Sequence, residues 1–372
     1  CIPAPVSGGI TVSLLTLSCH AFFGTDFIFD GTIKDLCMML FFTSVGFQSN
    51  LRVIRQGGRQ LLVMVGLVAL LIVLQNLLSV GIAKGMHLDP LIGMATGSIP
   101  MSGGHGTAGG FSPVLERMGL TGAASVTMAA ATFGLVAGSM IGGPLGERLI
   151  ARNDLARETD SEDIFMELEG SDAMEEKRQE RPVSDEQISR KFTQAACQLL
   201  LAMALGAGLN RLLSLTGLTF PTYFGALLAA ALIRNLAGKN AQKWICTDQI
   251  VSLGNTCLSL FLGMAMATLK LWELAGLMLP LVVILLAQMV LIVLFSLLVA
   301  FPALGKTYDA AVLVSGLCGF GLGATPNAMA NMSAVCFKYH YSVKPFIIVP
   351  IIGAMFVDII NTGVITLFLN LL

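Results

Sequence analysis

Charged residues are scarce in this sequence. Asp, Glu, Lys and Arg make up 12% of its 372 residues, which is about half of their share in an average soluble domain. A soluble fold needs more polar side chains than this to cover its surface, so the shortage excludes an ordinary water-soluble globular protein. The net charge of −1 shows no excess of basic residues, so nothing indicates binding to nucleic acid.

Charge is missing altogether from seven long stretches. They are 60–83, 90–115, 118–146, 212–233, 249–269, 274–305 and 310–337. A helix needs about 20 apolar residues to cross the hydrocarbon core of a bilayer, and most of these stretches are long enough. They are continuous rather than alternating, which excludes a transmembrane β-barrel. The sequence therefore predicts an all-α integral membrane protein in contact with the lipid bilayer.

The sequence also lacks the residue patterns of a metal site, a disulfide framework or an enzyme. Its eight cysteines are scattered and mostly lie inside apolar stretches, without the spacing of metal ligands or of a disulfide scaffold. The predicted spans contain no Ser/Lys pair, no paired aspartates and no His-Glu metal motif. We therefore expect neither an enzyme nor an organic cofactor.

The remaining residues divide into membrane elements and one polar segment. The predicted elements are 2–22, 36–50, 60–84, 90–117, 120–147, 192–213, 219–234, 246–268, 274–301, 309–337 and 345–371. Residues 149–190 instead contain thirteen acidic and six basic residues within 42 positions, which indicates a solvated cytoplasmic linker. The linker separates a first transmembrane repeat, 1–148, from a second, 191–372.

The two repeats resemble each other. Similar residues recur at offsets of 213 to 220, in the pairs Pro3/Pro221, Gln75/Gln288, Asp89/Asp309 and Thr107/Thr325. This agreement indicates an internal duplication. The second repeat begins with a helix, 192–213, that has no counterpart in the first, so we expect about one helix upstream of Cys1.

The distribution of positive charge predicts the orientation. Placing the linker in the cytoplasm puts 17 Lys and Arg residues on that side and 5 on the other, as the positive-inside rule requires. This placement works only if 90–117 and 309–337 each enter and leave by the same face, as re-entrant hairpins. Each half then has five true spans, an odd number that inverts one half relative to the other. The C-terminus falls on the periplasmic side.

Each predicted hairpin contains a glycine cluster that we interpret as a substrate-binding tip. The candidate residues are Ser102, Gly103, Gly104, His105, Gly106 and Thr107 in the first hairpin, and Gly321, Gly323, Ala324, Thr325, Pro326 and Asn327 in the second. Irregular backbone at membrane depth is tolerated only where protein or water satisfies it, so it indicates a cavity. Thr107 and Thr325 could cap the helices that follow, with Pro326 in the first helical turn. Two helix N-termini that meet from opposite sides would attract a carboxylate.

Other interpretations of these residues stay open. Glycines can simply allow close helix packing, and we favour that interpretation for Gly134, Gly138, Gly142 and Gly146. His105 could donate to a substrate carboxylate or serve as a hydrogen-bonded structural residue. Gln75 and Gln288 are interpreted as hydrogen-bonding partners between helices, outside the site.

The last predicted helix carries a candidate site for Na⁺. Asp358 is the acidic residue inside this apolar helix, and Asn361 follows three positions later on the same face. A carboxylate within the membrane is costly and indicates function, although a structural pair is the alternative. Oxygens of Asp358, Asn361 and Asn331 could coordinate Na⁺, because hard cations prefer oxygen ligands.

Several long strings carry a resemblance to a known family. They are Ile2–Gly9 (IPAPVSGG), Ser102–Thr107 (SGGHGT), Ala131–Val136 (ATFGLV), Gly319–Pro326 (GFGLGATP) and Asp358–Asn361 (DIIN). With these strings the sequence resembles the bacterial sodium/glutamate symporter family over nearly all of its length except the linker. It departs from the expected pattern in reading Pro-Ala-Pro at Pro3–Pro5, where Pro-Glu-Pro would be expected, and in its unusually acidic linker.

The resemblance implies two inverted five-helix repeats, each with a re-entrant hairpin that carries the glycine motif. It also implies uptake of glutamate driven by Na⁺ across the bacterial inner membrane, by a homodimer that moves its hairpins as an elevator. Two alternatives stay open: a Na⁺-coupled transporter of another carboxylate, and a passive anion channel, which also needs backbone ligands at the midplane. Only a transporter can concentrate its substrate.

Overall fold

The structure of the chain is a computed structural model that describes residues 4–25, 27, 29–49, 58–155, 185–215, 220–237, 244–272 and 277–372. These residues form helices and no strand, as predicted. The helices are α1 (Ala4–Phe23), α2 (Thr32–Gln48), α3 (Gly58–Gly85), α4 (Pro90–Thr96), α5 (Gly104–Arg117), α6 (Ala123–Asn153), α8 (Asp185–Ser214), α9 (Phe224–Leu236), α11 (Thr247–Ala267), α12 (Met278–Phe295), η6 (Ser296–Ala300), α13 (Phe301–Ala303), α14 (Tyr308–Leu322), α15 (Thr325–Lys338), α16 (Val343–Ile351), η7 (Ile352–Phe356) and α17 (Val357–Leu371).

Six of the described helices are long and apolar enough to cross a membrane. They cover Pro5–Phe23, Arg59–Gly85, Ala123–Asn153, Ser189–Ser214, Thr247–Ala267 and Met278–Ala303. Each coincides with a predicted element, and shorter apolar helices accompany them. The chain is therefore a multi-pass helical membrane protein.

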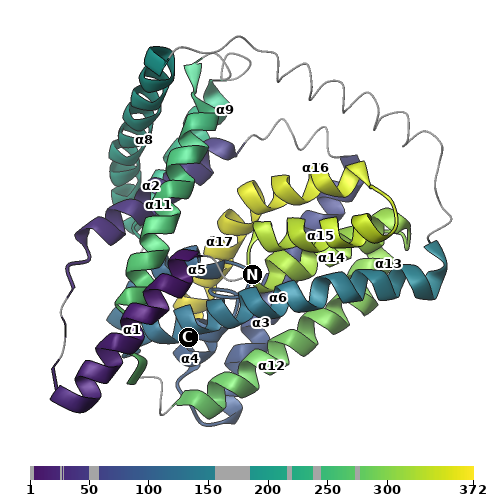
Figure 1. Ribbon diagram of the computed structural model, residues 1–372, viewed down its shortest axis with the longest axis horizontal. Helices are drawn as coiled ribbons and strands as arrows, with labels where there is room; N and C mark the ends of the chain where they lie inside the picture. Colours follow the sequence, from purple (N-terminus) through teal and green to yellow (C-terminus); the bar gives the residue numbers. More distant parts are fainter. Residues whose placement is uncertain are drawn as a thin grey trace.

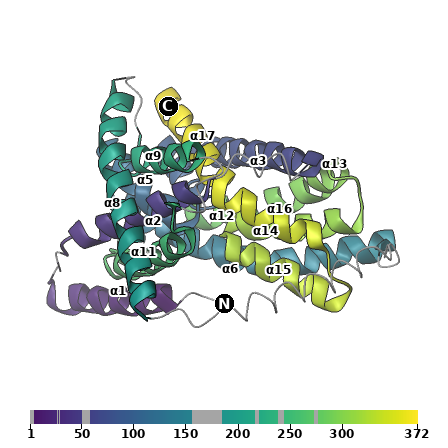
Figure 2. The same ribbon diagram turned by 90° about the horizontal axis from the view of Figure 1, so that it is seen from above.

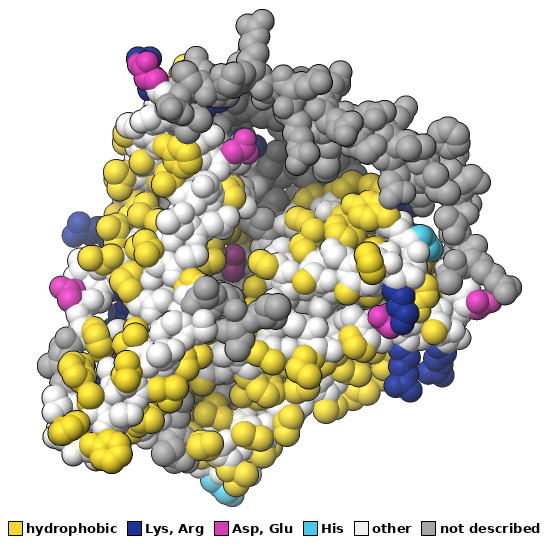
Figure 3. Space-filling model, viewed as in Figure 1, with side chains coloured by type: hydrophobic (Ala, Val, Ile, Leu, Met, Phe, Trp, Pro, Cys, Tyr) yellow, Lys and Arg dark blue, Asp and Glu magenta, His cyan; other side chains and the backbone are white. Residues whose placement is uncertain are grey.

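Helix α12 shows how such a helix divides its two faces. Its inner face buries apolar residues together with Gln288, while the outer face exposes only apolar side chains. That outer stripe is Leu279, Val282, Leu286, Val290, Leu294 and Leu298, and it is about 30 Å long at 1.5 Å per residue. This length matches the hydrocarbon core of a bilayer. Hydrophobic side chains cover much of the face seen in Figure 3 as well.

The helices form two groups that lie side by side in Figures 1 and 2. We call α1, α2, α8, α9 and α11 the first bundle, because these helices pack on one another. The second bundle contains α3–α6 and α12–α17. An apolar core joins the two, in which Phe42 and Phe261 of the first bundle lie with Phe111 and Met128 of the second.

Both glycine-broken elements are helix-break-helix units. The element predicted at 90–117 consists of α4, a turn at 97–103 and α5, whereas the one at 309–337 consists of α14, the pair Gly323-Ala324 and α15. The second break falls within its glycine cluster, whereas the first overlaps the predicted tip only at Ser102 and Gly103, and the remaining residues of that tip lie in α5. The last element, 345–371, is one long helix interrupted by the π-helical segment η7. Most of the predicted linker, residues 156–184, lies outside the described residues.

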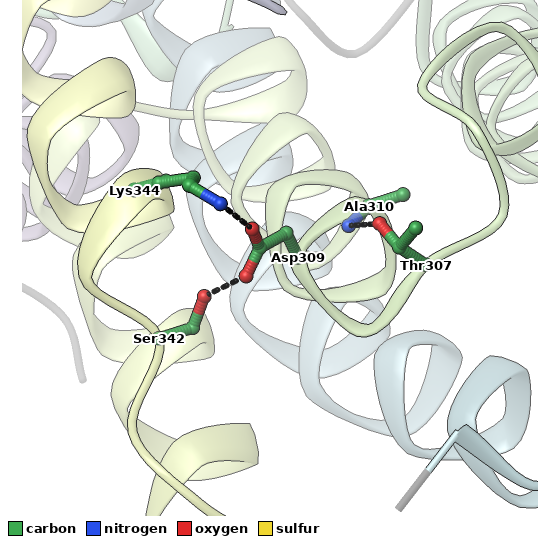
Figure 4. A network of polar contacts seen from close by, with 5 residues as sticks. All are labelled: Thr307, Asp309, Ala310, Ser342 and Lys344. Atoms are coloured by element: carbon green, nitrogen blue, oxygen red, sulfur yellow. Dashed lines mark hydrogen bonds and ion pairs between the residues drawn. The ribbon is translucent and has the colours of Figure 1, made fainter. Parts of the chain in front are cut away.

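The starts of α4 and α14 differ in chemistry although their aspartates align in sequence. Asp89 caps α4, because its side chain accepts a hydrogen bond of 2.8 Å from the amide of Leu91. In α14 the cap is Thr307, and Asp309 instead contacts Lys344 at 3.5 Å and accepts from Ser342 (Figure 4). Asp309 therefore connects α14 to the start of α16.

These two contacts are expected to differ in their contribution to stability. Thr307→Ala removes a helix cap and should cost about 1 kcal/mol. Lys344→Met removes a largely exposed ion pair, which is typically worth between about 0 and 1 kcal/mol. The melting temperature of the purified protein should fall clearly for the threonine variant and little for the lysine variant; the reverse order would contradict the assignment of the cap.

Candidate functional site: two glycine breaks and a buried oxygen cluster

The two glycine breaks meet inside the second bundle. A Cβ atom placed on Gly104 would lie 2.7 Å from the carbonyl oxygen of Gly323, so a larger residue cannot be accommodated there without a shift. Gly104 also has a φ of +59°, which side-chain-bearing residues adopt only rarely. Residues about 220 positions apart thus come together at this point.

Neither predicted threonine cap is present. Helix α5 begins one turn before Thr107, with Gly103 at its N-cap, while α15 begins at Thr325 with Ala324 at its N-cap. Glycine and alanine have no side-chain acceptor, so neither cap makes a side-chain hydrogen bond. The first amides of α5 are left without a side-chain partner, whereas in α15 this holds only for the amide of Thr325, because Pro326 has no N–H and Asn327 donates to the carbonyl oxygen of Ala324. Both helix starts carry partial positive charge toward the breaks. Pro326 lies in the first turn of α15, as predicted.

Gln75 of α3 bridges the two hairpins. Its Nε2 donates to the carbonyl oxygen of Gly321 at 2.7 Å, and its Oε1 accepts from the hydroxyl of Ser102 at 2.7 Å. Gln288 donates to the backbone oxygen of Gln75 at 2.8 Å. Both glutamines are completely buried. They do bond between helices, as predicted, and Gln75 contacts one candidate residue of each predicted tip, although the sequence interpretation left it outside the site.

The neighbouring Asn76 holds the turn between α4 and α5. Its amide donates to the hydroxyl of Ser98 at 2.8 Å, and its oxygen accepts from the amide of Ser98 at 2.9 Å. Asn361 of α17 donates to the carbonyl oxygen of Ser98 at 3.0 Å. The predicted Na⁺ ligand Asn361 therefore supports the first hairpin with its nitrogen, while its buried Oδ1 has no hydrogen-bond partner in the described part of the chain.

The side chains of the first and second hairpins contact α6 in similar ways. His105 is buried and its Nε2 lies 3.1 Å from the hydroxyl of Thr132. Asn327 donates to Leu135 at 2.7 Å, and Asn331 donates to Gly138 at 2.9 Å, both at backbone oxygens. Asn331 thus bonds to α6 rather than to α17, where Asp358 and Asn361 lie.

The four glycines of α6 let it lie close to the second hairpin. A Cβ on any of Gly134, Gly138, Gly142 and Gly146 would come within 3.1 Å of atoms of α14 or α15. The packing interpretation of these glycines is confirmed. The second break itself is more open, since Pro326 is exposed and Thr325 half-buried.

The segment η7 lies against this second break. A Cβ on Gly353 would collide with the side chain of Thr325, so η7 and the start of α15 are in close contact. π-helical segments occur often at functional sites. Here the segment directly precedes Asp358, whose position in the fold therefore depends on it.

A cluster of oxygen atoms surrounds Asp358. The hydroxyl of Thr107 lies next to its half-buried carboxylate, and the hydroxyl of Tyr223 lies near this carboxylate and next to the hydroxyls of Thr107 and Thr362. Within the described residues, none of these three buried hydroxyls makes a hydrogen bond of regular geometry, although each lies near another oxygen of the cluster. Buried polar groups are normally satisfied, so unpaired oxygens gathered around a carboxylate indicate a cation site. Of the predicted Na⁺ ligands, Asp358 lies in this oxygen cluster and Asn361 shares its helix face.

Tyr223 brings the first bundle into this cluster. It lies just before α9 and stacks on Phe42 of α2, with ring centroids 3.7 Å apart. On its other side, Gly110 of α5 leaves room for the ring, where a Cβ would clash. The sequence interpretation missed Tyr223 and Thr362, because neither lies in a glycine cluster or carries charge. Gln75 could have been found from the sequence, because it is a polar residue in an apolar helix and pairs with Gln288 in the predicted duplication.

Comparison with known proteins adds independent evidence. The family described as Sodium/glutamate symporter matches residues 1–341. The chain is 38% identical over 371 residues to the sodium/glutamate symporter of Escherichia coli K12, covering 100% of this chain and 90% of that protein. It is 34% identical over 363 residues to the sodium/glutamate symporter of Haemophilus influenzae, covering 97% of this chain and 88% of that protein.

Proposed function

Because the chain belongs to the sodium/glutamate symporter family, we propose that it takes up glutamate together with Na⁺. Its relatives are named as symporters, so the chain is a transporter and not an enzyme. The observation that carries the proposal is the meeting of two uncapped helix N-termini beside a cluster of unpaired oxygens.

The glutamate carboxylates bind at the two breaks. The amides that begin α5, and the amide of Thr325 at the start of α15, provide hydrogen-bond donors, and both helix starts provide partial positive charge for an anion. The walls of this site are Ser102–Thr107 on one side and Gly321, Gly323, Ala324, Thr325, Pro326 and Asn327 on the other. Gln75 positions both walls through its bonds to Ser102 and Gly321.

Sodium binds next to this site, at the oxygen cluster. The carboxylate of Asp358 supplies the charge, and the hydroxyls of Thr107, Thr362 and Tyr223 supply neutral oxygens. Asn361 adds its unpaired Oδ1 from the same face of α17. Asn331 stays outside this group because its amide holds α6. Since Thr107 lies in the first turn of α5, whose start binds glutamate, the two solutes share one structural element.

Coupling to Na⁺ is needed on energetic grounds. Glutamate carries a net charge of −1, and its entry against an inside-negative potential costs about 2.3 kcal/mol per 100 mV. Two or more Na⁺ ions per glutamate reverse the sign of the transported charge. The potential and the Na⁺ gradient then both favour uptake.

The two bundles provide the moving parts of an elevator. The second bundle carries both breaks, and the first bundle contributes Tyr223 to the oxygen cluster. Movement of the second bundle takes Asp358 away from Tyr223, so the cation site is complete in one position only. The protein works as a homodimer in the bacterial inner membrane, with two inverted repeats, re-entrant hairpins, a cytoplasmic linker and a periplasmic C-terminus.

Uptake of labelled L-glutamate into sealed proteoliposomes tests the proposal. We expect accumulation above equilibrium with an inward Na⁺ gradient, and none when choline replaces Na⁺. Liposomes without protein serve as the control. Flux without accumulation would indicate an anion channel instead, and Na⁺-driven accumulation of another carboxylate with none of glutamate would change the substrate.

A further inference from the structure

A cavity with charged residues in its lining lies away from the breaks, between α2, α5, α6 and the end of α11. It has a volume of about 490 Å³, which is enough for a small amino acid. Lys34, Glu116 and Lys270 line it together with Ser112, Thr121 and Thr268. The proposed orientation places the starts of α2 and the ends of α5 and α11 on the outer side of the membrane.

The cavity has a polar rim and a closed apolar floor. Lys270 and Glu116 are exposed and Lys34 is half-buried, so the charged groups lie where solvent reaches them. The floor consists of Phe261 and Met128, both almost completely buried. Gly109 allows these two side chains to pack against α5, since a Cβ there would clash with the ring of Phe261.

The cavity lies along the helix that leads to the glutamate site. Ser112 and Gly109 of α5 line the cavity. Thr107 lies on the same helix, less than two turns nearer the break. Five residues of helix from Ser112 to Thr107 span about 8 Å. The floor thus separates the cavity from the break by a short distance.

The charges of the cavity complement those of glutamate. In the described part of the chain, the charged side chains that line it are two lysines and one glutamate, which sum to +1, while free glutamate carries two carboxylates and one ammonium group, a net charge of −1. A cleft with one sign of charge raises the local concentration of the opposite ion and speeds its capture. The hydroxyls of Thr121 and Thr268 offer further hydrogen bonds.

We propose that this cavity is an outer capture site for acidic amino acids, in which Lys34 and Lys270 bind the two carboxylates and Glu116 binds the ammonium group. The role of this capture site in uptake rests on the proposed function, but the binding of glutamate to it does not require Na⁺. Glutamate waits here above the floor formed by Phe261 and reaches the breaks when the second bundle moves.

The double variant Lys34→Gln/Lys270→Gln tests the capture site by two measurements. The first is Na⁺-free binding of labelled L-glutamate to the purified protein at an ionic strength of about 0.01 M, where charges act over about 30 Å. The second is KM for Na⁺-driven uptake at the same ionic strength. We expect the double variant to lose the Na⁺-free binding and to raise KM several-fold with kcat unchanged, because two exposed charge pairs with the carboxylates are lost and each contributes modestly. The difference in KM should disappear in about 1 M choline chloride.

Two further variants serve as matched controls. Lys84→Gln removes an exposed lysine that the sequence places on the same outer side but that does not line the cavity, so KM should not change. Lys34→Arg/Lys270→Arg keeps both charges and should retain the wild-type values. Equal KM and equal salt dependence in the glutamine double variant and the wild type would overturn the capture site and leave symport intact. A third outcome would overturn the proposed function alone: the wild type binds glutamate without Na⁺, the double variant does not, and the wild type shows no Na⁺-driven uptake.

Glu116→Gln tests recognition of the ammonium group separately. Glutarate has the two carboxylates of glutamate and no amine, so Glu116 should repel it without any compensating contact. We expect glutarate to compete about threefold better against labelled glutamate for Na⁺-free binding in this variant than in the wild type. Unchanged competition would remove Glu116 from the proposal.

Discussion

Gln75→Leu is expected to reduce Na⁺-driven glutamate uptake by about 30-fold or more. The leucine leaves the hydroxyl of Ser102 and the carbonyl oxygen of Gly321 buried without the partner they now have. Each unsatisfied buried group costs about 1–3 kcal/mol. Ser102 lies in the first break, and Gly321 lies two residues before the second. The loss therefore falls on the arrangement of the glutamate site. The measurement is initial uptake into proteoliposomes with equal amounts of folded protein.

Gln288→Leu is the matched control for this prediction. Gln288 is as deeply buried in an apolar helix, and it is the residue that the sequence pairs with Gln75 in the proposed duplication. It makes one bond, to the backbone of Gln75, and its own Oε1 has no partner in the described part of the chain. Its loss should be several-fold smaller. Similar losses in both variants would show that Gln75 acts through general packing and not through the breaks.

Asp358→Asn is expected to raise the Na⁺ concentration for half-maximal uptake by about tenfold or more. The change keeps the shape of the side chain and removes the charge that the surrounding hydroxyls cannot supply. A tenfold change corresponds to about 1.4 kcal/mol, a modest part of what a carboxylate contributes to a cation site of low polarity. At saturating Na⁺ the affinity for glutamate should recover. The measurement is uptake across a Na⁺ series at fixed ionic strength.

Two threonines of α17 allow a cation site to be distinguished from a general effect of buried polar groups. Thr362 lies in the oxygen cluster, whereas Thr366 lies one turn further along; both are buried and both have an unpaired hydroxyl among the described residues. Thr362→Val should weaken Na⁺ dependence, while Thr366→Val should leave it unchanged. If neither Asp358→Asn nor Thr362→Val changes the Na⁺ response, the oxygen cluster is not the coupling site.

Much of the fold could be predicted because lipid imposes a simple rule. A span needs a long run without charge, and the runs in this sequence coincide with the helices. The breaks at Gly103 and Gly323 were also visible, because glycine clusters interrupt apolar runs only rarely. The predicted positions of the two helix caps were wrong by one to four residues, because the caps are Ala324 and Gly103 instead of Thr325 and Thr107. In the first case the chain turns earlier than predicted, where Gly104 adopts a left-handed conformation.

The site was harder to predict because its parts come from distant segments. Tyr223 and Asp358 lie in different bundles, and nothing in their own neighbourhoods indicates that they meet. Gln75 was recognised as a bonding residue, yet its partners depend on how α3 crosses both hairpins. No sequence pattern predicted the π-helical segment η7, although this segment brings Gly353 against Thr325.

Helix α14 is almost completely buried. All of its residues except Asp309 are buried, between α6 on one side and α15 on the other. During synthesis α6 precedes it and α15 follows it, so a nascent chain that ends before Thr325 has no cover for the face around Gly319, where α15 later packs. This helix therefore reaches its final position only after the ribosome has made the rest of its hairpin, and chains truncated between 323 and 338 should be short-lived substrates of membrane proteases.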